Sequence, residues 1–183
     1  VLQQLVLLQD RVKPFDNHVA KMRIQESLKA DVNTLFARFD EQPLAAASIA
    51  QVHTAALHDG REVVVKVTRP DIRSQILQDF EILEWLGNFL EKRLEAARAL
   101  HLSEIIQDYR QIILKELDLT LEADNTRRMR HYFTGSSMMY VPEVYMDSSD
   151  VMVAERITGV PISDTATFDQ LGMDRRRSEE RRV

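Results

Sequence analysis

A single lysine interrupts a run of valines at residues 62–67, which read EVVVKV. Such a β-branched run predicts a strand. Because side chains alternate between the two faces of a strand, Lys66 and Val64 share one face while the valines at 63, 65 and 67 share the other. An ammonium group flanked by valines is costly to desolvate unless an anion meets it. Lys66 is therefore expected to contact a phosphate or a carboxylate.

Acidic residues that could meet such a lysine gather at residues 115–125, KELDLTLEADN. Ser103 as an N-cap and Glu104 in the first turn predict a helix that runs through this segment to about residue 132. On a straight helix Glu116 and Asp118 lie about 200° apart, whereas Asp118 and Glu122 share a face one turn apart. A metal cage built from all of these acids is therefore not expected.

The plainest interpretation of the same acids is a solvated helix face, on which Asp124 would pair with Arg128 four residues later. The other interpretation is that one of these acids binds Lys66. The residues by themselves do not select Glu122 over its neighbours as the partner of the lysine.

A stretch of small residues, PLAAASIAQVH at 43–53, precedes the valine run. It predicts a tight loop that leads into a strand around Val52, an Asp59-Gly60 turn and the strand that carries Lys66. This order of parts is that of the nucleotide-binding hairpin of protein-kinase-like folds, where a loop covers the phosphates and a strand lysine contacts them. The loop here lacks a G-x-G-x-x-G sequence and is built from alanines.

The alanine-rich loop followed by VVVK closely resembles the UbiB family of atypical kinase-like proteins, which are associated with ubiquinone biosynthesis. The resemblance implies that Glu122 pairs with Lys66. It also implies that Glu116 and Asp118 are regulatory E-x-D acids, which engage an upstream K-x-G-Q segment that does not occur in this sequence. The hinge, whose backbone binds adenine, would begin at Glu155. The residues that the resemblance nominates for nucleotide contact are Ala45, Ala46, Ala47, Ser48, Ile49, Ala50, Gln51, Val52, Lys66, Glu122, Glu155 and Ile157.

The elements around this hairpin follow from hydrophobic periodicity. Helices are predicted over 1–13, 21–37 and 71–100, and in the last of these Trp85 and Phe89 are interpreted as core residues. Two short strands are predicted at about 139–145 and 151–156, on either side of the turn DSSD. Met152 or Val153 of the second strand would line the adenine pocket or belong to the plain core. The remaining core residues predicted near the N-terminus are Leu28, Leu35, Phe36 and Phe39.

Composition narrows the class of protein. The chain has 183 residues, enough for one domain with a core, and a net charge of -5, which argues against nucleic-acid binding. It contains no cysteine, and its five histidines are too scattered for a zinc site. The apolar runs are shorter than the ~20 residues of a membrane span, and the first residues do not read as a signal peptide. A soluble segment is expected.

These features together predict an α+β fold: a kinase-like N-lobe with a small antiparallel sheet and long family-specific helices, without the second lobe. The expected divisions are an N-terminal helical extension at 1–39, the lobe at 40–160, and a hinge exit with a charged tail at 161–183. The resemblance is expected to end near residue 173, and both ends look cut.

By resemblance, the intact protein would be an atypical kinase or ATPase that uses ATP or ADP with Mg²⁺ and supports the handling of hydrophobic quinone precursors. It would act at the cytoplasmic face of the bacterial inner membrane, with a quinone-precursor lipid or other quinone-biosynthesis proteins as partners. No catalytic residue or metal ligand is expected in this segment, because the H-x-D loop and the D-F-G motif belong to the second lobe. The alternative is a non-catalytic helical module that binds a lipid or a protein partner.

Overall fold

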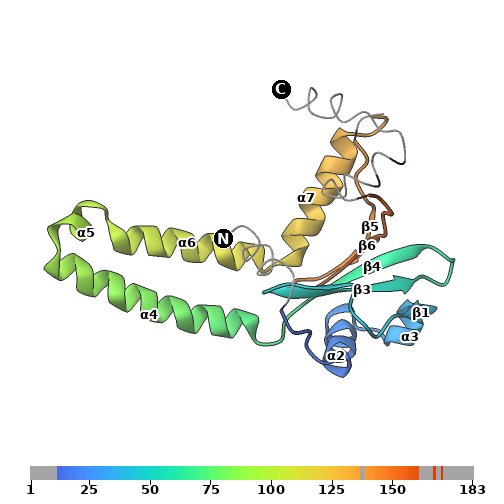
Figure 1. The fold of residues 1–183 in the computed structure, drawn as a ribbon, viewed down its shortest axis with the longest axis horizontal. Coiled ribbons are helices and arrows are strands. Elements are labelled where there is room, and N and C mark those ends of the chain that lie inside the picture. The colour runs from blue at the N-terminus through green and yellow to red at the C-terminus, as the bar shows by residue number, and fades with distance from the viewer. Residues whose placement is uncertain (1–11, 137–138, 161–166, 168–169, 171–183) are drawn as a thin grey trace.

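The chain folds into one antiparallel sheet with helices on both of its faces and a long helical arm that extends to one side (Figure 1). The structure is a computed structural model that describes residues 12–136, 139–160, 167 and 170. Residues 1–11 of the helix predicted over 1–13, and most of the predicted tail, therefore lie outside the described residues. Mixed helix and antiparallel sheet confirm the α+β class.

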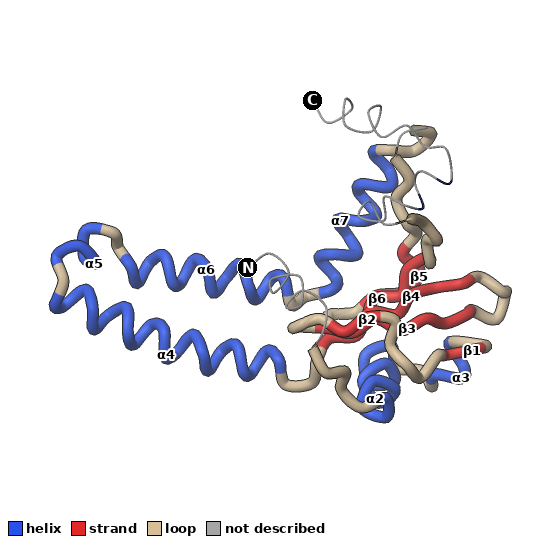
Figure 2. Tube along the Cα trace, in the orientation of Figure 1, coloured by secondary structure: helices blue, strands red, loops and turns tan. Residues whose placement is uncertain are grey.

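In the described part of the chain, six strands make up the sheet, in the order β1-β3-β4-β6-β5 with β2 beside β3 (Figure 2). The predicted hairpin is confirmed, since β3 pairs with β4 from Ala50 opposite Thr68 to Ala56 opposite Glu62. Gly60 in its turn has a φ of 86°, a left-handed conformation that glycine adopts without strain. The strands are β1 (Arg38–Phe39), β2 (Ala45–Ala46), β3 (Ala50–Ala56), β4 (Glu62–Thr68), β5 (Val144–Asp147) and β6 (Val151–Glu155).

One face of the sheet packs against α2 (Asn17–Leu28) and α3 (Val32–Leu35). The single helix predicted over 21–37 is wrong in both bounds: Asp16 caps α2 through the amide of His18, and Lys29 ends it in a left-handed conformation. The valines at 63, 65 and 67 lie fully buried here, as alternation predicts. The other buried members of this core are Ile24, Val32, Phe36, Ala55, Leu57, Val151 and Val153, and the predicted Leu28, Leu35 and Phe39 pack against it.

The opposite face of the sheet, which carries Lys66, packs against α7 (Leu119–Tyr132). A small core forms here from Leu119 and Ala123 of the helix and Met152 of β6. Met152 stands opposite Lys66 in the strand register. The sheet thus separates a large apolar core from a smaller one that borders the lysine.

The arm consists of α4 (Ile72–Arg93), α5 (Glu95–Ala99) and α6 (Leu102–Glu116), with α4 and α6 side by side (Figure 1). The helix predicted to about residue 100 ends earlier, because Leu94 is extended. The two helices approach each other at Gly87, where an added Cβ would lie 2.7 Å from Cδ1 of Ile106. No helix within the described ranges is both long and apolar enough to cross a membrane.

The arm leaves a row of large apolar side chains exposed, which corrects the sequence interpretation. Trp85 is 65% exposed and Phe89 36%, so neither is a core residue. Their rings stack with centroids 5.6 Å apart, and the guanidinium of Arg93 lies 4.4 Å from the Phe89 ring. Among the described residues no second layer lies on α4 and α6, so only one stripe of each of these helices is covered. The other large apolar residues exposed on the arm are Ile82, Leu83, Leu86, Leu94, Leu100, Ile105, Tyr109 and Ile112.

Candidate functional site

Lys66 and Glu122 form an ion pair between the sheet and α7. The Lys66 Nζ donates to Oε2 of Glu122 at 2.5 Å, and both side chains are half-buried. This is the contact that the resemblance implied, and the structure confirms it. An ammonium held by one carboxylate has donor capacity left for a second anion, so the pair can orient the lysine toward a phosphate.

The helix that carries Glu122 begins at a break that the sequence analysis missed. α6 ends at Glu116, Leu117 is buried, and Asp118 is extended and caps α7 by accepting from the amide of Thr120 at 3.0 Å. The single helix predicted from Ser103 to residue 132 is therefore wrong, and Ser103 lies inside α6 instead of capping it. The signal was present, because aspartate is among the residues most favoured at an N-cap.

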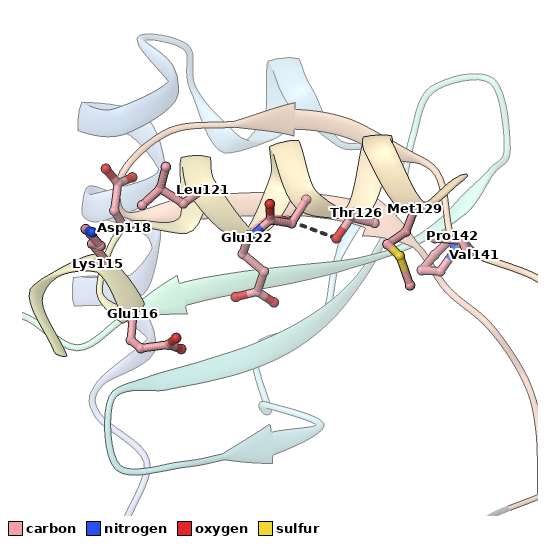
Figure 3. Close-up of a pocket in the computed structure, with 10 residues that line it drawn as sticks. Lys115, Glu116, Asp118, Leu121, Glu122, Thr126, Met129, Val141 and Pro142 are labelled. Carbon is pink, nitrogen blue, oxygen red and sulfur yellow. Dashed lines mark hydrogen bonds between the residues drawn. The ribbon is translucent and has the colours of Figure 1, made fainter. Parts of the chain in front are cut away.

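Because of the break, Glu116 and Asp118 do not lie on opposite sides of one helix. They line, together with Glu122, a cavity of about 620 Å³ beside α7 (Figure 3). In the part of the chain that the structure describes, no three His, Cys, Asp or Glu residues are grouped so as to hold a metal ion. The remaining lining residues were not singled out from the sequence: Lys115, Leu121, Asn125, Thr126, Met129, Val141 and Pro142.

The alanine-rich loop forms a small hairpin at the edge of the sheet. Ala45 and Ala46 pair with β3, and residues 47–49 make the turn, which the amide of Ala47 closes on the carbonyl of Ala50 at 2.8 Å. Arg69 fixes this turn: its amide donates to the carbonyl of Ile49 at 2.8 Å and its Nε to that of Ala47 at 2.9 Å. Arg69 was not predicted as a site residue, and it ties the loop to the residue that follows β4.

The residues nominated in β3 face both sides of the sheet. Val52 stands opposite Lys66 in the register and shares its face. Gln51 lies on the other face, where it is buried and its Nε2 lies 2.8 Å from Nε2 of His53. The His53 Nδ1 lies 2.9 Å from the carbonyl of Asp40, and burial lowers the pKa of His53, so the neutral ring accepts from Gln51. The Gln51 side chain therefore points away from the Lys66 side, and only its backbone is left for a ligand.

The predicted hinge begins where β6 ends. The carboxylate of Glu155 accepts from the Tyr140 hydroxyl at 2.5 Å and from the amide of Glu143 at 3.1 Å. The hydrogen bond from Tyr140 is the main cause that lowers the pKa of Glu155 below its ordinary value. The Glu155 side chain is thus bound to Tyr140 and Glu143 at the edge of the sheet. Ile157, two residues further along the chain, is exposed. Their contact with a nucleotide stays a prediction.

Two further expectations are decided by the geometry. Of Met152 and Val153, Met152 lies on the face of Lys66, and Val153 is buried in the core on the other face. Asp124 pairs with Arg127, three residues on, at 3.2 Å, and not with Arg128. The Arg127 guanidinium also binds Asp147 of β5, which ties α7 to the sheet.

Comparison with known proteins places these features in a family context. A family model described as the ABC1 atypical kinase-like domain matches residues 7–182. Proteins named "Probable protein kinase UbiB" from Pseudomonas entomophila and Erwinia tasmaniensis are 47% and 46% identical over the whole chain. The chain spans 34% of the length of each.

The structural comparison agrees with the sequence matches. A solved structure described as the Rv3197–erythromycin complex from Mycobacterium tuberculosis has a TM-score of 0.73 and 26% sequence identity, over 93% of this chain and 43% of that chain. The matched region also corrects one expectation. The family match continues to residue 182, so the resemblance does not end near residue 173.

Proposed function

The chain belongs to the ABC1 atypical kinase-like family, and we propose that the sheet face around Lys66 forms the phosphate-binding half of an ATP or ADP site. The observation that carries this proposal is the Lys66–Glu122 ion pair, which spans 56 positions of the sequence. A lysine on a central strand, oriented by a helix carboxylate, is the arrangement that kinase folds use to hold the α- and β-phosphates.

The other parts of the half-site support the same assignment. The alanine-rich hairpin, fixed by Arg69, would cover the phosphates, with Val52 next to Lys66. The backbone from Glu155 onward would meet the adenine ring, and Met152 borders the same face as the lysine. Mg²⁺ bound together with the nucleotide would supply positive charge that neutralises the phosphates. The described carboxylates are not grouped to hold it alone, so its protein ligands would come from elsewhere in the intact protein.

For the intact protein we propose an ATP-dependent role in ubiquinone biosynthesis, at the cytoplasmic face of the bacterial inner membrane. The named relatives and the family match support the kinase-like class and the link to ubiquinone biosynthesis, and the location is proposed from the family resemblance alone. The catalytic loop and the metal-binding motif of kinases do not occur in this sequence. This chain by itself is therefore expected to bind nucleotide without turning it over.

The test is nucleotide binding by calorimetry, with Mg-ADP and Mg-ATP added to the chain, to Lys66→Ala and to Lys21→Ala. Lys21 lies on α2 and pairs with Glu41 at 2.7 Å, so its loss removes one exposed cation without touching the site. The proposal expects weaker binding only for Lys66→Ala. Equal affinity in all three folded chains, or no binding at all, would contradict it.

The alanine loop carries a narrower proposal: nucleotide handling that differs from that of ordinary protein kinases, with phosphorylation of protein substrates disfavoured. Alanine stiffens a backbone that glycine would leave free to approach phosphates. Ala46→Gly is expected to change the affinity ratio between ATP and ADP. An unchanged ratio in a folded variant counts against the idea.

A second candidate function is contact with a hydrophobic quinone precursor through the arm. The exposed stripe of Ile82, Trp85, Leu86 and Phe89 favours it, since contiguous apolar surface of this kind marks an interaction site. Trp85 is the single tryptophan of the chain, so its fluorescence reports directly on this face. A prenylated phenol in detergent micelles should shift the emission to the blue relative to micelles alone, and less so in Phe89→Ser. Identical spectra with and without the phenol would exclude this candidate.

A further inference from the structure

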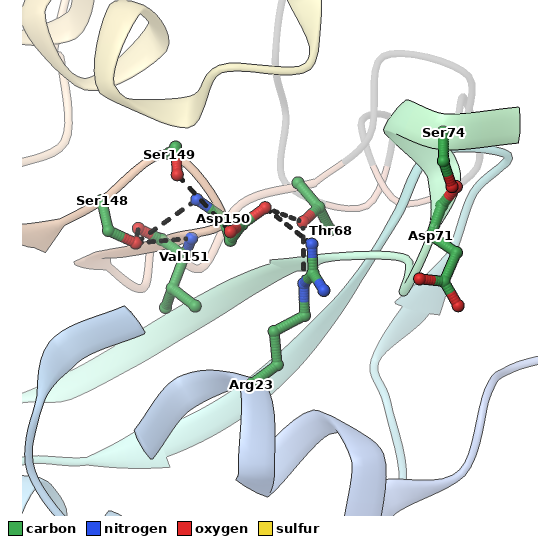
Figure 4. Close-up of polar contacts among 8 residues, drawn as sticks. All are labelled: Arg23, Thr68, Asp71, Ser74, Ser148, Ser149, Asp150 and Val151. Atoms are coloured by element: carbon green, nitrogen blue, oxygen red, sulfur yellow. Dashed lines mark hydrogen bonds and ion pairs between the residues drawn. The ribbon is translucent and has the colours of Figure 1, made fainter. Parts of the chain in front are cut away.

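The turn between β5 and β6 is a junction at which three other elements of the fold meet. Within it, Ser148 Oγ accepts from the amides of Asp150 and Val151 at 3.3 and 3.0 Å, and the Ser148 amide donates to the Val151 carbonyl at 2.8 Å (Figure 4). These bonds give the turn a fixed shape. Its outward-facing groups are left to bind the neighbouring elements.

The first element that the turn holds is the end of β4, two residues beyond Lys66. The amide of Thr68 donates to the carbonyl of Asp150 at 2.9 Å, and the Thr68 hydroxyl donates to Oδ1 of Asp150 at the same distance. Thr68 is buried. Both bonds fix the strand that carries the lysine.

The second element is α7, which carries Glu122. The amide of Leu119, the first residue of the helix, donates to the carbonyl of Ser149 at 3.1 Å. Two turns further along, Arg127 binds the half-buried carboxylate of Asp147 at the start of the turn. The turn therefore contacts both the strand of Lys66 and the helix of Glu122.

The third element is α2, which packs on the face of the sheet away from Lys66. Its Arg23 donates through Nη2 to Oδ1 of Asp150 at 2.7 Å and through Nε to the Thr68 hydroxyl at 3.2 Å (Figure 4). The three polar groups form a closed ring, in which the hydroxyl donates to the carboxylate and accepts from the guanidinium. A charge-assisted bond shared in this way is stronger than a neutral one.

We propose that Arg23, Thr68 and Asp150 are positioning residues for the Lys66–Glu122 pair. Through them α2, which packs on the opposite face of the sheet, controls the distance between the Lys66 ammonium and the Glu122 carboxylate. Loss of Arg23 frees the Asp150 carboxylate to turn toward solvent, which breaks its bond with the Thr68 hydroxyl. The backbone of the turn, which holds the amides of Thr68 and Leu119, is then less firmly fixed. The Glu122 carboxylate then leaves the lysine more often. The consequence for nucleotide binding rests on the proposed function, but the consequence for the ion pair does not.

The experiment measures the acylation rate of Lys66 directly, by trace labelling of the folded chain with acetic anhydride and peptide mass spectrometry. An ammonium bound to a carboxylate reacts slowly, because it must leave its partner and lose its proton first. Glu122→Gln sets the rate of the unpaired lysine. Arg23→Gln and Thr68→Val should raise the rate about threefold toward that limit, the size expected for an ion pair of this exposure. Thr68→Ser keeps the hydroxyl and should restore the wild-type rate.

The matched control is Lys21→Gln, which removes an ion pair from the same helix without contact to the turn. It should leave the Lys66 rate unchanged. If Arg23→Gln and Thr68→Val also leave the rate unchanged while Glu122→Gln raises it, the proposal is overturned. If Thr68→Ser matches Thr68→Val, the hydroxyl has no positioning role and the proposal is overturned as well.

A parallel titration with Mg-ADP separates this inference from the proposed function. Weaker binding in Arg23→Gln together with faster acylation supports both. If the wild-type chain binds no Mg-ADP but Arg23→Gln is still acylated faster at Lys66, the result supports the positioning role and contradicts the nucleotide site.

Discussion

The two helical regions that follow β4 differ in what covers their apolar faces. α7 lies on the sheet and buries Leu119, which is 1% exposed, against Met152. In the arm the buried residues are Phe80 and Gly87 of α4 and Ala97 of α5, no residue of α6 is buried, and Ile112 is 55% exposed. A periodic apolar stripe therefore shows that a helix needs a partner surface, but not whether the rest of the chain supplies it.

Truncating one apolar side chain in each region should give the largest contrast in stability. Leu119→Ala is expected to lower the free energy of unfolding by about 3 kcal/mol, because the buried site cannot collapse around the cavity. Ile112→Ala should change it by no more than about 0.5 kcal/mol. Urea unfolding measures both, and similar losses would show that the arm is covered in solution.

The two helix starts allow a second test at a smaller scale. Asp118→Ala removes the cap of α7 and should cost about 1 kcal/mol. Ser103→Ala is the control, since Ser103 lies inside α6 and its hydroxyl donates to Oδ1 of Asn88 at 3.2 Å instead of capping the helix. Loss of this exposed bond should change the free energy of unfolding by no more than about 0.5 kcal/mol. A loss for Ser103→Ala as large as that for Asp118→Ala would contradict the assignment of the cap to Asp118.

The smallest effect concerns pH at the sheet edge. Because the folded pKa of Glu155 lies below its ordinary 4.5, its ionised form stabilises the fold above that pH, and this contribution is lost as the pH falls through the lowered value. The difference in unfolding free energy between wild type and Tyr140→Phe should therefore narrow between about pH 6 and about pH 3. A constant difference over that range would exclude a charge-assisted bond from Tyr140.

The hairpin and the face on which Lys66 lies could be predicted from the sequence, because strand alternation and the Asp-Gly turn signal depend only on neighbouring residues. Alternation correctly predicted that Lys66 and the buried valines lie on opposite faces of the strand. The Lys66–Glu122 pair was predicted from the family resemblance. The break at Asp118 was missed because the apolar spacing continues across it, so periodicity outweighed the capping signal. Because of that error, Glu116 and Asp118 were predicted to lie on opposite faces of one helix, whereas in the structure both line the same cavity.

Other misses have a tertiary cause. Trp85 and Phe89 have the spacing of a core stripe, but no second layer within the described ranges buries them. Gln51 was grouped with the loop by sequence adjacency, while the strand register sends its side chain to the opposite face. Arg69 was missed because its contacts are to backbone carbonyls of the loop, which no side-chain motif reveals.

The most direct test of the central claim is a methyl NMR titration of the alanine-labelled chain with Mg-ADP. The chain carries alanines in both regions: Ala45, Ala46 and Ala47 in the loop, and Ala96, Ala97 and Ala99 in α5 of the arm. The account predicts shifts for the loop methyls and none for the arm methyls. Shifts in the arm with an unchanged loop, or no shifts at all, would contradict a phosphate-binding site beside Lys66.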